Sequence, residues 1–236
     1  MIVTAALILF VSALLQSTIG FGSALVAMPM LSPLLGIQTA AAMVGLVSVA
    51  FSLLVVVIDR RQIDLRQSWR LMLASLAGVP FGLLLLRNVP ERAVLFGLGV
   101  VLVGYGLFGL TSGRLKLRGG QWMAWPLGFV SGVLGGAYNT NGPPLVVFGT
   151  LQQWPPQQFR ATLQGVFFIT GIAIAAGQAS AGFWTPAALQ MTAWAAPGVL
   201  AAALLGRWLN TRIPHASFLR IVYGMLIALG VALILK

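Results

Sequence analysis

The chain has 236 residues, of which 59% are hydrophobic and 7% are charged, whereas about a quarter of the residues are charged in a soluble domain. Its net charge is +11, and it contains no cysteine, which excludes disulfides, thiol nucleophiles and thiolate metal sites. Residues 2–58 and 161–206 contain no Lys, Arg, Asp or Glu, which argues against a soluble core and against a nucleic-acid-binding surface.

The apolar residues fall into ten segments, five in each half of the chain. In chain order these are residues 2–18, 23–35, 38–58, 69–87, 92–111, 122–136, 142–152, 160–178, 186–206 and 217–235. A helix of about 20 apolar residues spans a bilayer. The sequence therefore predicts an all-α polytopic membrane protein. We expect no cleaved signal peptide, because the first residues lack a basic region and read as the start of the first span.

Two apolar stretches are too long for one straight span. Residues 2–35 would form a helix of about 51 Å, and they are interrupted at Gly20-Phe21-Gly22. Residues 122–152 are interrupted at Gly135-Gly136 and at Gly142-Pro143-Pro144. Each stretch is either one broken, tilted helix or a hairpin of two shorter helices.

The positions of the basic residues favour hairpins. Three connections carry them, with Arg60, Arg61, Arg66 and Arg70 in the first, Arg114, Lys116 and Arg118 in the second, and Arg207 and Arg212 in the third. If both stretches are hairpins, all three connections lie on one side, and the uncharged connection 179–185 lies on the other. The positive-inside rule then makes the basic side cytoplasmic and places both termini in the periplasm. Arg87 and Arg92, partly offset by Glu91, fit this topology less well.

The two halves of the chain resemble each other. When Gly20 is placed on Gly135, Pro29 falls on Pro144. We predict a first transmembrane repeat over residues 1–113 and a second over 114–236. Each repeat would consist of a broken helix or helical hairpin followed by three transmembrane helices. An odd number of segments inverts the second repeat relative to the first, as in many secondary transporters.

Several motifs resemble those of the TauE/SafE family of sulfite and organosulfur-anion transporters. They are Gly20 to Ser23 with Pro29, Gly78 to Gly82, Gly132 to Pro144, and Arg160-Ala161-Thr162. The resemblance covers nearly the whole chain. It implies a multi-pass protein of the bacterial inner membrane that moves small anions such as sulfite, sulfoacetate or related organosulfonates.

The two breaks also predict an anion site on physical grounds. A half-helix N-terminus offers unpaired N–H groups and about half a positive charge. Two such termini that meet at the midplane would bind an anion, and alternating access to this site would carry the anion across the membrane. The candidate substrate-binding residues lie at or near the breaks. They are Gln16, Ser17, Thr18, Gly20, Gly22, Ser23, Gly135, Gly136, Tyr138, Asn139, Thr140, Asn141, Gly142, Arg160 and Gln164.

Some of these side chains have simpler explanations. Ser17 and Thr18 can bond to carbonyls of their own helix, and Arg160 can extend to the membrane interface. Asn139 and Asn141 are harder to explain by packing, because two amides at membrane depth need partners. The carboxylates Asp59, Asp64 and Glu91 are in connections, as is the histidine His215, which disfavours proton coupling through intramembrane carboxylates.

We therefore expect a transporter rather than an enzyme, with no catalytic residue, metal or cofactor. An anion channel, or a carrier of another small carboxylate or oxyanion, is the alternative. The expected partners are a small anionic substrate and the lipid bilayer, with no nucleic acid. The sequence is compatible with a homodimer. It does not identify the anion, the direction of transport or a coupling ion.

Overall fold

The computed structural model describes residues 2–111, 120–210 and 215–235, in which helices predominate and no strand occurs. The ten predicted segments are confirmed, with ends that shift by about one turn or less. The helices are α1 (Ile2–Ile19), α2 (Ser23–Leu35), α3 (Ile37–Asp59), η1 (Arg60–Gln62), α4 (Leu65–Asn88), α5 (Glu91–Thr111), η3 (Gln121–Met123), α6 (Ala124–Tyr138), α7 (Gly142–Leu151), α8 (Pro156–Ser180), α9 (Pro186–Asn210) and α10 (His215–Ile234).

Five helical stretches among the described residues are long and apolar enough to cross a membrane. They are Ile37–Gln62, Ser68–Asn88, Glu91–Thr111, Gln157–Ser180 and Pro186–Gly206. Large apolar side chains also cover the outside of the molecule, for example Val57, Leu84 and Leu204, which are more than half exposed. A surface of this kind suits lipid rather than water. The chain is a multi-pass membrane protein.

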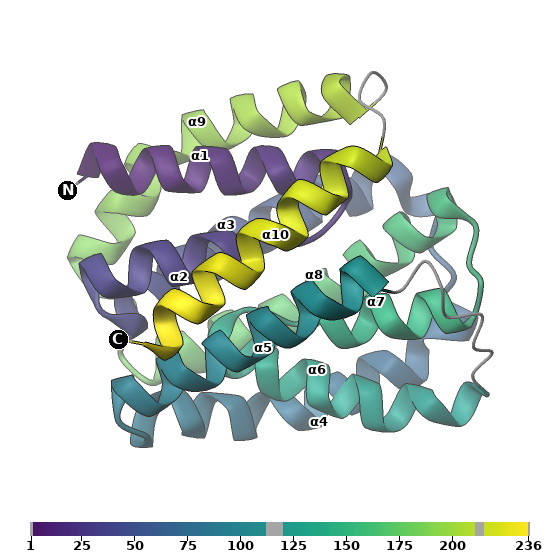
Figure 1. Cartoon of the computed structure of the whole chain (residues 1–236), viewed down its shortest axis with the longest axis horizontal. Coiled ribbons are helices and arrows are strands. Elements are labelled where there is room, and N and C mark those ends of the chain that lie inside the picture. Colours follow the sequence, from purple (N-terminus) through teal and green to yellow (C-terminus); the bar gives the residue numbers. More distant parts are fainter. Residues whose placement is uncertain (1, 112–119, 211–214, 236) are drawn as a thin grey trace.

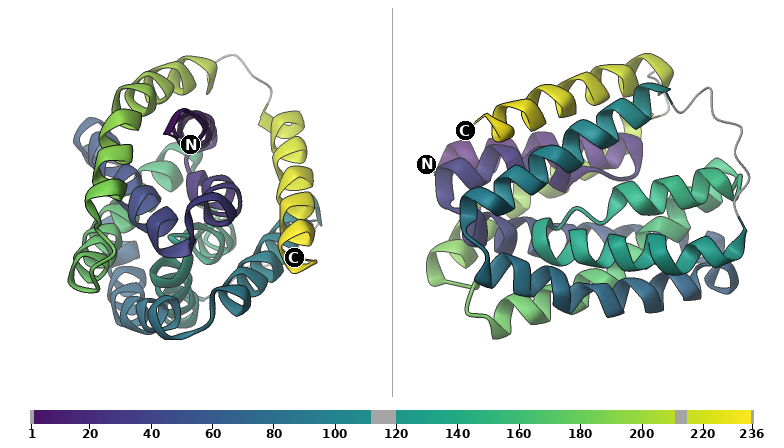
Figure 2. Two further views of the ribbon diagram at one scale, coloured as in Figure 1. Left: turned by 90° about the vertical axis from the view of Figure 1, so that its left-hand side faces the viewer. Right: turned by 60° about the horizontal axis from the view of Figure 1, so that its bottom comes forward.

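The two broken stretches are hairpins. In the second one, Ser131 Oγ donates a hydrogen bond of 2.7 Å to the carbonyl of Asn141, so the chain after α6 turns back along α6. Helix α2 likewise packs against α1, and α7 against α6. We call the residues between the paired helices, 20–22 and 139–141, the first and second tips. Figures 1 and 2 show that both chain termini lie at the same end of the molecule.

Helices of the two halves alternate in space. Helix α1 packs along α9 and α4 along α6, while α3 contacts α8 and α5 contacts α10 (Figure 1). If each of the helices α1 to α5 is exchanged for its counterpart among α6 to α10, the same set of pairs results. The inverted orientation and the boundary between residues 113 and 114 stay predictions. The pairings are those that two such repeats would make.

Helix ends give a different repeat register from the one that places Gly20 on Gly135. A separation of 119 residues relates Ile19 to Tyr138, Ser23 to Gly142 and Ile37 to Pro156. In this register Gly20 corresponds to Asn139. The difference is four residues, about one helical turn.

The contact between α4 and α6 is a seam of small residues. A Cβ on Gly132 would collide with the carbonyl oxygen of Ser75, and one on Gly82 with the carbonyl oxygen of Val133. A Cβ on Gly136 would likewise collide with the carbonyl oxygen of Val79. Such close backbone approach stabilises helix pairs in lipid, where the hydrophobic effect adds little between helices.

The arginine-containing connection between α3 and α4 lies at one end of the molecule, which we call the basic end. There Gln158 Nε2 donates to Asp64 Oδ2 over 2.9 Å, which joins the start of α8 to the connection before α4. Arg60 and Arg61 lie in η1 at this end, opposite both termini (Figure 1). The predicted basic residues Arg114, Lys116, Arg118 and Arg212 lie outside the described residues.

Candidate functional site

The first tip depends on two glycines in left-handed conformations. Helix α1 ends at Ile19, and Gly20 and Gly22 have φ angles of +97° and +99° on either side of Phe21. Only glycine adopts such angles without steric cost. The chain then enters α2 at Ser23. The first backbone N–H groups of α2 have no partner within the helix.

The second tip turns at Asn139 and not at the paired glycines. Asn139 has a φ angle of +53°, and its N–H donates to the carbonyl of Gly135 at 2.8 Å. The predicted interruption at Gly135-Gly136 is wrong, because both residues lie within α6. They provide close packing, since Gly136 lies on the Val79 backbone and Gly135 beside Asn141. Asparagine tolerates the left-handed region better than most residues, so it can take glycine's place at this turn.

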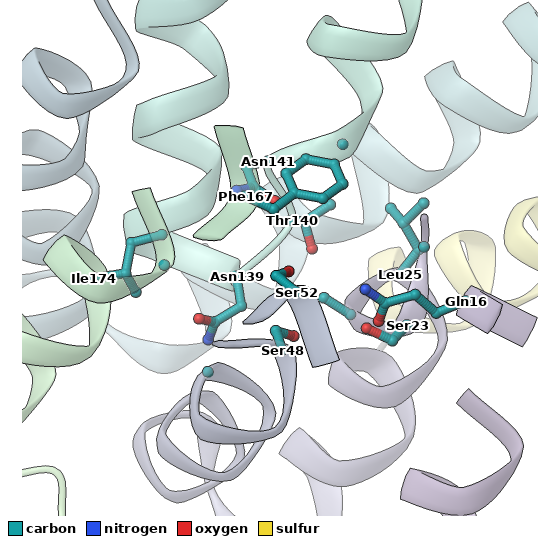
Figure 3. A pocket seen from close by; sticks show the side chains of 15 residues that line it. Gln16, Ser23, Leu25, Ser48, Ser52, Asn139, Thr140, Asn141, Phe167 and Ile174 are labelled. Atoms are coloured by element: carbon teal, nitrogen blue, oxygen red, sulfur yellow. The ribbon is translucent and has the colours of Figure 1, made fainter. Parts of the chain in front are cut away.

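The two tips enclose a polar cavity together with α3 and α8 (Figure 3). Its volume is about 30 Å³, measured as the space open to the centres of water-sized spheres. About 10–15 Å³ on that measure holds one water, so the cavity suits compact ligands. The lining residues are Gln16, Gly22, Ser23, Ala24, Leu25, Gly45, Ser48, Ser52, Asn139, Thr140, Asn141, Gly142, Phe167, Gly171 and Ile174.

Seven of the candidate residues line this cavity. They are Gln16, Gly22, Ser23, Asn139, Thr140, Asn141 and Gly142. The remaining candidates lie around it. Ser17 Oγ donates to the carbonyl of Ala203 on α9 at 2.6 Å, and Thr18 Oγ1 donates to Leu14 of its own helix at 2.8 Å. Tyr138 extends toward α5, where its hydroxyl lies against Gly97.

Gln164 holds the first tip in place from α8. Its Nε2 donates to the carbonyl of Gly20 at 2.7 Å, and its Oε1 accepts from Ser52 Oγ at 2.9 Å. Gly20 also lies against Arg160, since a Cβ on Gly20 would be 3.2 Å from Arg160 Cγ. Gln164 and Arg160 therefore support the tip and do not line the cavity.

The second tip is held in a corresponding way from α3. Asn139 Nδ2 donates to the carbonyl of Ala41 at 2.8 Å, and Asn139 Oδ1 lies 3.5 Å from Gln178 Nε2. Asn141 Nδ2 donates to Thr170 Oγ1 at 3.2 Å. Each tip is thus bonded to a long helix of the opposite half of the chain.

The two helix N-termini differ in the donors that they offer. Helix α2 begins with Ser23, Ala24 and Leu25, which all have N–H groups and all line the cavity. Helix α7 begins with Gly142, but Pro143 and Pro144 follow and have no N–H group. The partial positive charge of the helix dipole remains at both termini.

Serines of α3 complete the cavity, although they were not among the predicted site residues. Ser48 and Ser52 are one turn apart in the otherwise apolar stretch 40–58 of α3, and Ser52 is 1% exposed. That spacing places two hydroxyl groups on one face, which is a signal that a search restricted to the breaks does not detect. On α8, Phe167, Gly171 and Ile174 add an apolar wall.

Among the described residues, no Lys, Arg, His, Asp or Glu lines the cavity. No group of three or more His, Asp or Glu side chains that could hold a metal ion occurs in the described ranges. The site therefore offers hydroxyls, amides and two helix N-termini to a ligand. This combination can bind a small anion without a formal countercharge.

Comparisons with known proteins give a family model and a relative that match the chain. A family model described as "Sulfite exporter TauE/SafE" matches residues 5–233. A protein from Cupriavidus necator, described as "Probable sulfite/organosulfonate exporter TauE", is 30% identical over 227 residues, covering 93% of this chain and 88% of its own. No solved structure matches the chain.

Proposed function

The chain belongs to the TauE/SafE family of sulfite exporters, and on that premise we propose that it exports small sulfur-containing anions across the bacterial inner membrane. The substrate class is sulfite and related organosulfonates. The printed name of the Cupriavidus relative supports this class. The cavity volume of about 30 Å³ favours sulfite over longer sulfonates such as sulfoacetate in this state of the protein.

The observation that carries the proposal is the meeting of two hairpin tips at one buried polar cavity. Gln16, Ser23, Ser52 and Thr140 line it, and each is at most 5% exposed. Two helix N-termini, at Ser23 and Gly142, provide positive potential there. A carrier needs such a site at the contact of its two repeats.

The way the tips are held supports a mechanism of alternating access. The first tip is bonded to α8 through Gln164, and the second is bonded to α3 through Asn139. If the hydrogen bonds at only one tip are released at a time, the cavity opens to only one side of the membrane. Export is the direction that an inside-negative potential favours, by about 2.3 kcal/mol per charge for each 100 mV.

The proposal includes a topology. The basic end faces the cytoplasm, because arginines in short connections remain inside. Both termini then lie in the periplasm. Residues 1–113 and 114–236 are the two repeats, and a homodimer in the bilayer is compatible with this arrangement.

A thermal-shift screen of the purified protein tests the function. We expect sulfite to raise the unfolding temperature, because a ligand that binds only the native state stabilises it by mass action. The Asn139→Ala/Asn141→Ala variant should lose this ligand-induced shift. Asn88→Ala, at the exposed end of α4, is the control and should keep it. A double variant with an unchanged shift would show that the site lies elsewhere.

Flux into liposomes distinguishes a carrier from a channel. A carrier gives saturable flux that exchanges internal for external anion. Flux that rises without saturation would replace the carrier proposal with a pore. Flux that requires a pH gradient and ignores the membrane potential would overturn the potential-driven mechanism.

A further inference from the structure

The cavity lining combines residues with free backbone N–H groups at the start of α2 with two hydroxyl oxygens that can only accept a hydrogen bond from a ligand. The donors are in the first half of the chain, where Ser23, Ala24 and Leu25 line the cavity and their N–H groups have no partner within α2. Figure 3 shows Gln16, Ser23 and Leu25 together on one side of the cavity, with Asn139, Thr140 and Asn141 across from them.

Ser52 can only accept a hydrogen bond from a ligand. Its hydroxyl proton is donated to Gln164 Oε1 at 2.9 Å. The orientation of Gln164 is determined, because its Nε2 must donate to the carbonyl of Gly20 at 2.7 Å. Gln164 Oε1 is therefore an acceptor, and the lone pairs of Ser52 Oγ remain for the cavity.

Thr140, at the second tip, can likewise only accept a hydrogen bond from a ligand. Its hydroxyl donates to the carbonyl of Tyr138 at 3.1 Å, which leaves lone pairs on Oγ1. The side-chain amides of this tip are already bonded within the protein, since Asn139 donates to Ala41 and Asn141 to Thr170. Thr170 in turn donates to Val166 at 2.7 Å, so it must accept from Asn141.

A fully deprotonated oxyanion fits such a cavity poorly. Its oxygens accept hydrogen bonds from the α2 amides but would face the lone pairs of Ser52 and Thr140 on the other side. The positive potential is also limited, because two helix N-termini supply about half a charge each, which balances one negative charge and not two.

We infer that the bound species is a monoanion carrying its own hydrogen-bond donor, which for sulfite means the singly protonated form, hydrogen sulfite. This inference rests on the proposed function and specifies the form of its substrate. The anionic oxygens face the amides of α2, and the hydroxyl donates to Thr140 across the cavity. The proton then leaves the cell with the anion, although no titratable side chain lines the cavity among the described residues.

The test measures ligand affinity by calorimetry at acidic, neutral and alkaline pH. Two probes are used: sulfite, whose singly protonated form loses its proton over this range, and methanesulfonate, a monoanion that carries a methyl group and no hydrogen-bond donor. Sulfite affinity should fall about tenfold for each pH unit above the pKa of hydrogen sulfite, because one proton accompanies each bound ion. Methanesulfonate should bind equally at every pH, and at least about tenfold more weakly than sulfite at acidic pH.

Thr140→Val and Thr18→Val form a matched pair of variants. Both threonines are buried, at 2% and 3% exposure, but only Thr140 lines the cavity. Thr140→Val should reduce the preference for sulfite over methanesulfonate by about tenfold, because valine cannot accept a hydrogen bond. Thr18→Val should leave the preference unchanged. A general loss of stability would weaken both ligands together and would leave their ratio intact.

The outcomes separate the two proposals. Sulfite that binds as tightly at alkaline as at acidic pH would overturn the inference and leave the exporter function standing. The same holds if Thr140→Val keeps the wild-type ratio. If neither sulfur anion binds at any pH, the proposed function itself is wrong.

Discussion

Replacing Gly132 by alanine should separate α4 from α6. A Cβ at this position would collide with the Ser75 carbonyl oxygen and lie 2.8 Å from the Ser75 carbonyl carbon and 2.9 Å from its Cα. Ordinary contacts between carbon atoms are about 3.5–4.0 Å. All three neighbours are backbone atoms, so no side-chain rotation relieves the overlap, and the helices must move apart by about 1 Å.

The size of the effect follows from comparison with a glycine in open space. Overpacking a tight contact costs about 1–3 kcal/mol. Gly104, in the middle of α5, has nothing within 4 Å of its Cβ position. Gly104→Ala should therefore stabilise the protein by about 0.5–1 kcal/mol, because alanine restricts the unfolded chain and favours helix. The two variants should differ by about 1.5–4 kcal/mol.

Scanning fluorimetry of the two variants in one detergent measures the difference. For a chain of this size, 1 kcal/mol shifts the unfolding temperature by about 2–4 °C, so Gly132→Ala should unfold about 10 °C below Gly104→Ala. The comparison within one detergent cancels its general effect on both variants. Equal unfolding temperatures would refute the reasoning, since they would mean that the seam accommodates a methyl group.

Two further predictions concern the tip conformation and the topology. Gly20→Ala should destabilise the protein more than Gly36→Ala in the same thermal assay. Both glycines have positive φ angles, +97° and +80°. Only at Gly20 would the new Cβ meet a close neighbour, Arg160 Cγ at 3.2 Å. Equal losses would show that backbone strain alone, about 1–2 kcal/mol, sets both effects. Because the chain contains no cysteine, single cysteines report topology directly. A membrane-impermeant maleimide added to intact cells should label Leu235→Cys and spare Arg61→Cys, and the reverse pattern would invert the proposed topology.

The helices were predictable because their signal is local. Apolar runs and their breaks place each of the ten helices to within about a turn, and the connection charges favour hairpins over kinked spans. The break between α2 and α3 is equally local, since it depends on Gly36 with its φ of +80°.

The repeat register and part of the site were not predictable in the same way. Aligning glycine with glycine matched Gly20 to Gly135, because residue identity was taken as the sign of a turn. In the structure Asn139 makes that turn, since two residue types can adopt one backbone conformation. The roles of Gln164 and Ser52 depend on a contact between residues 112 positions apart, which no periodicity reveals.

The alternation of the two halves in space affects how the chain is made. Helix α1 is synthesised first, but it packs on α9, and Ser17 bonds to a carbonyl 186 residues later. At about 5–20 residues per second, roughly 10–40 s pass before that partner leaves the ribosome. During this interval the polar face of α1, with Ser12 and Gln16, lacks its final neighbours in the bilayer. We therefore expect the first half, expressed alone, to be held by the insertion machinery and degraded rather than to assemble as an independent unit.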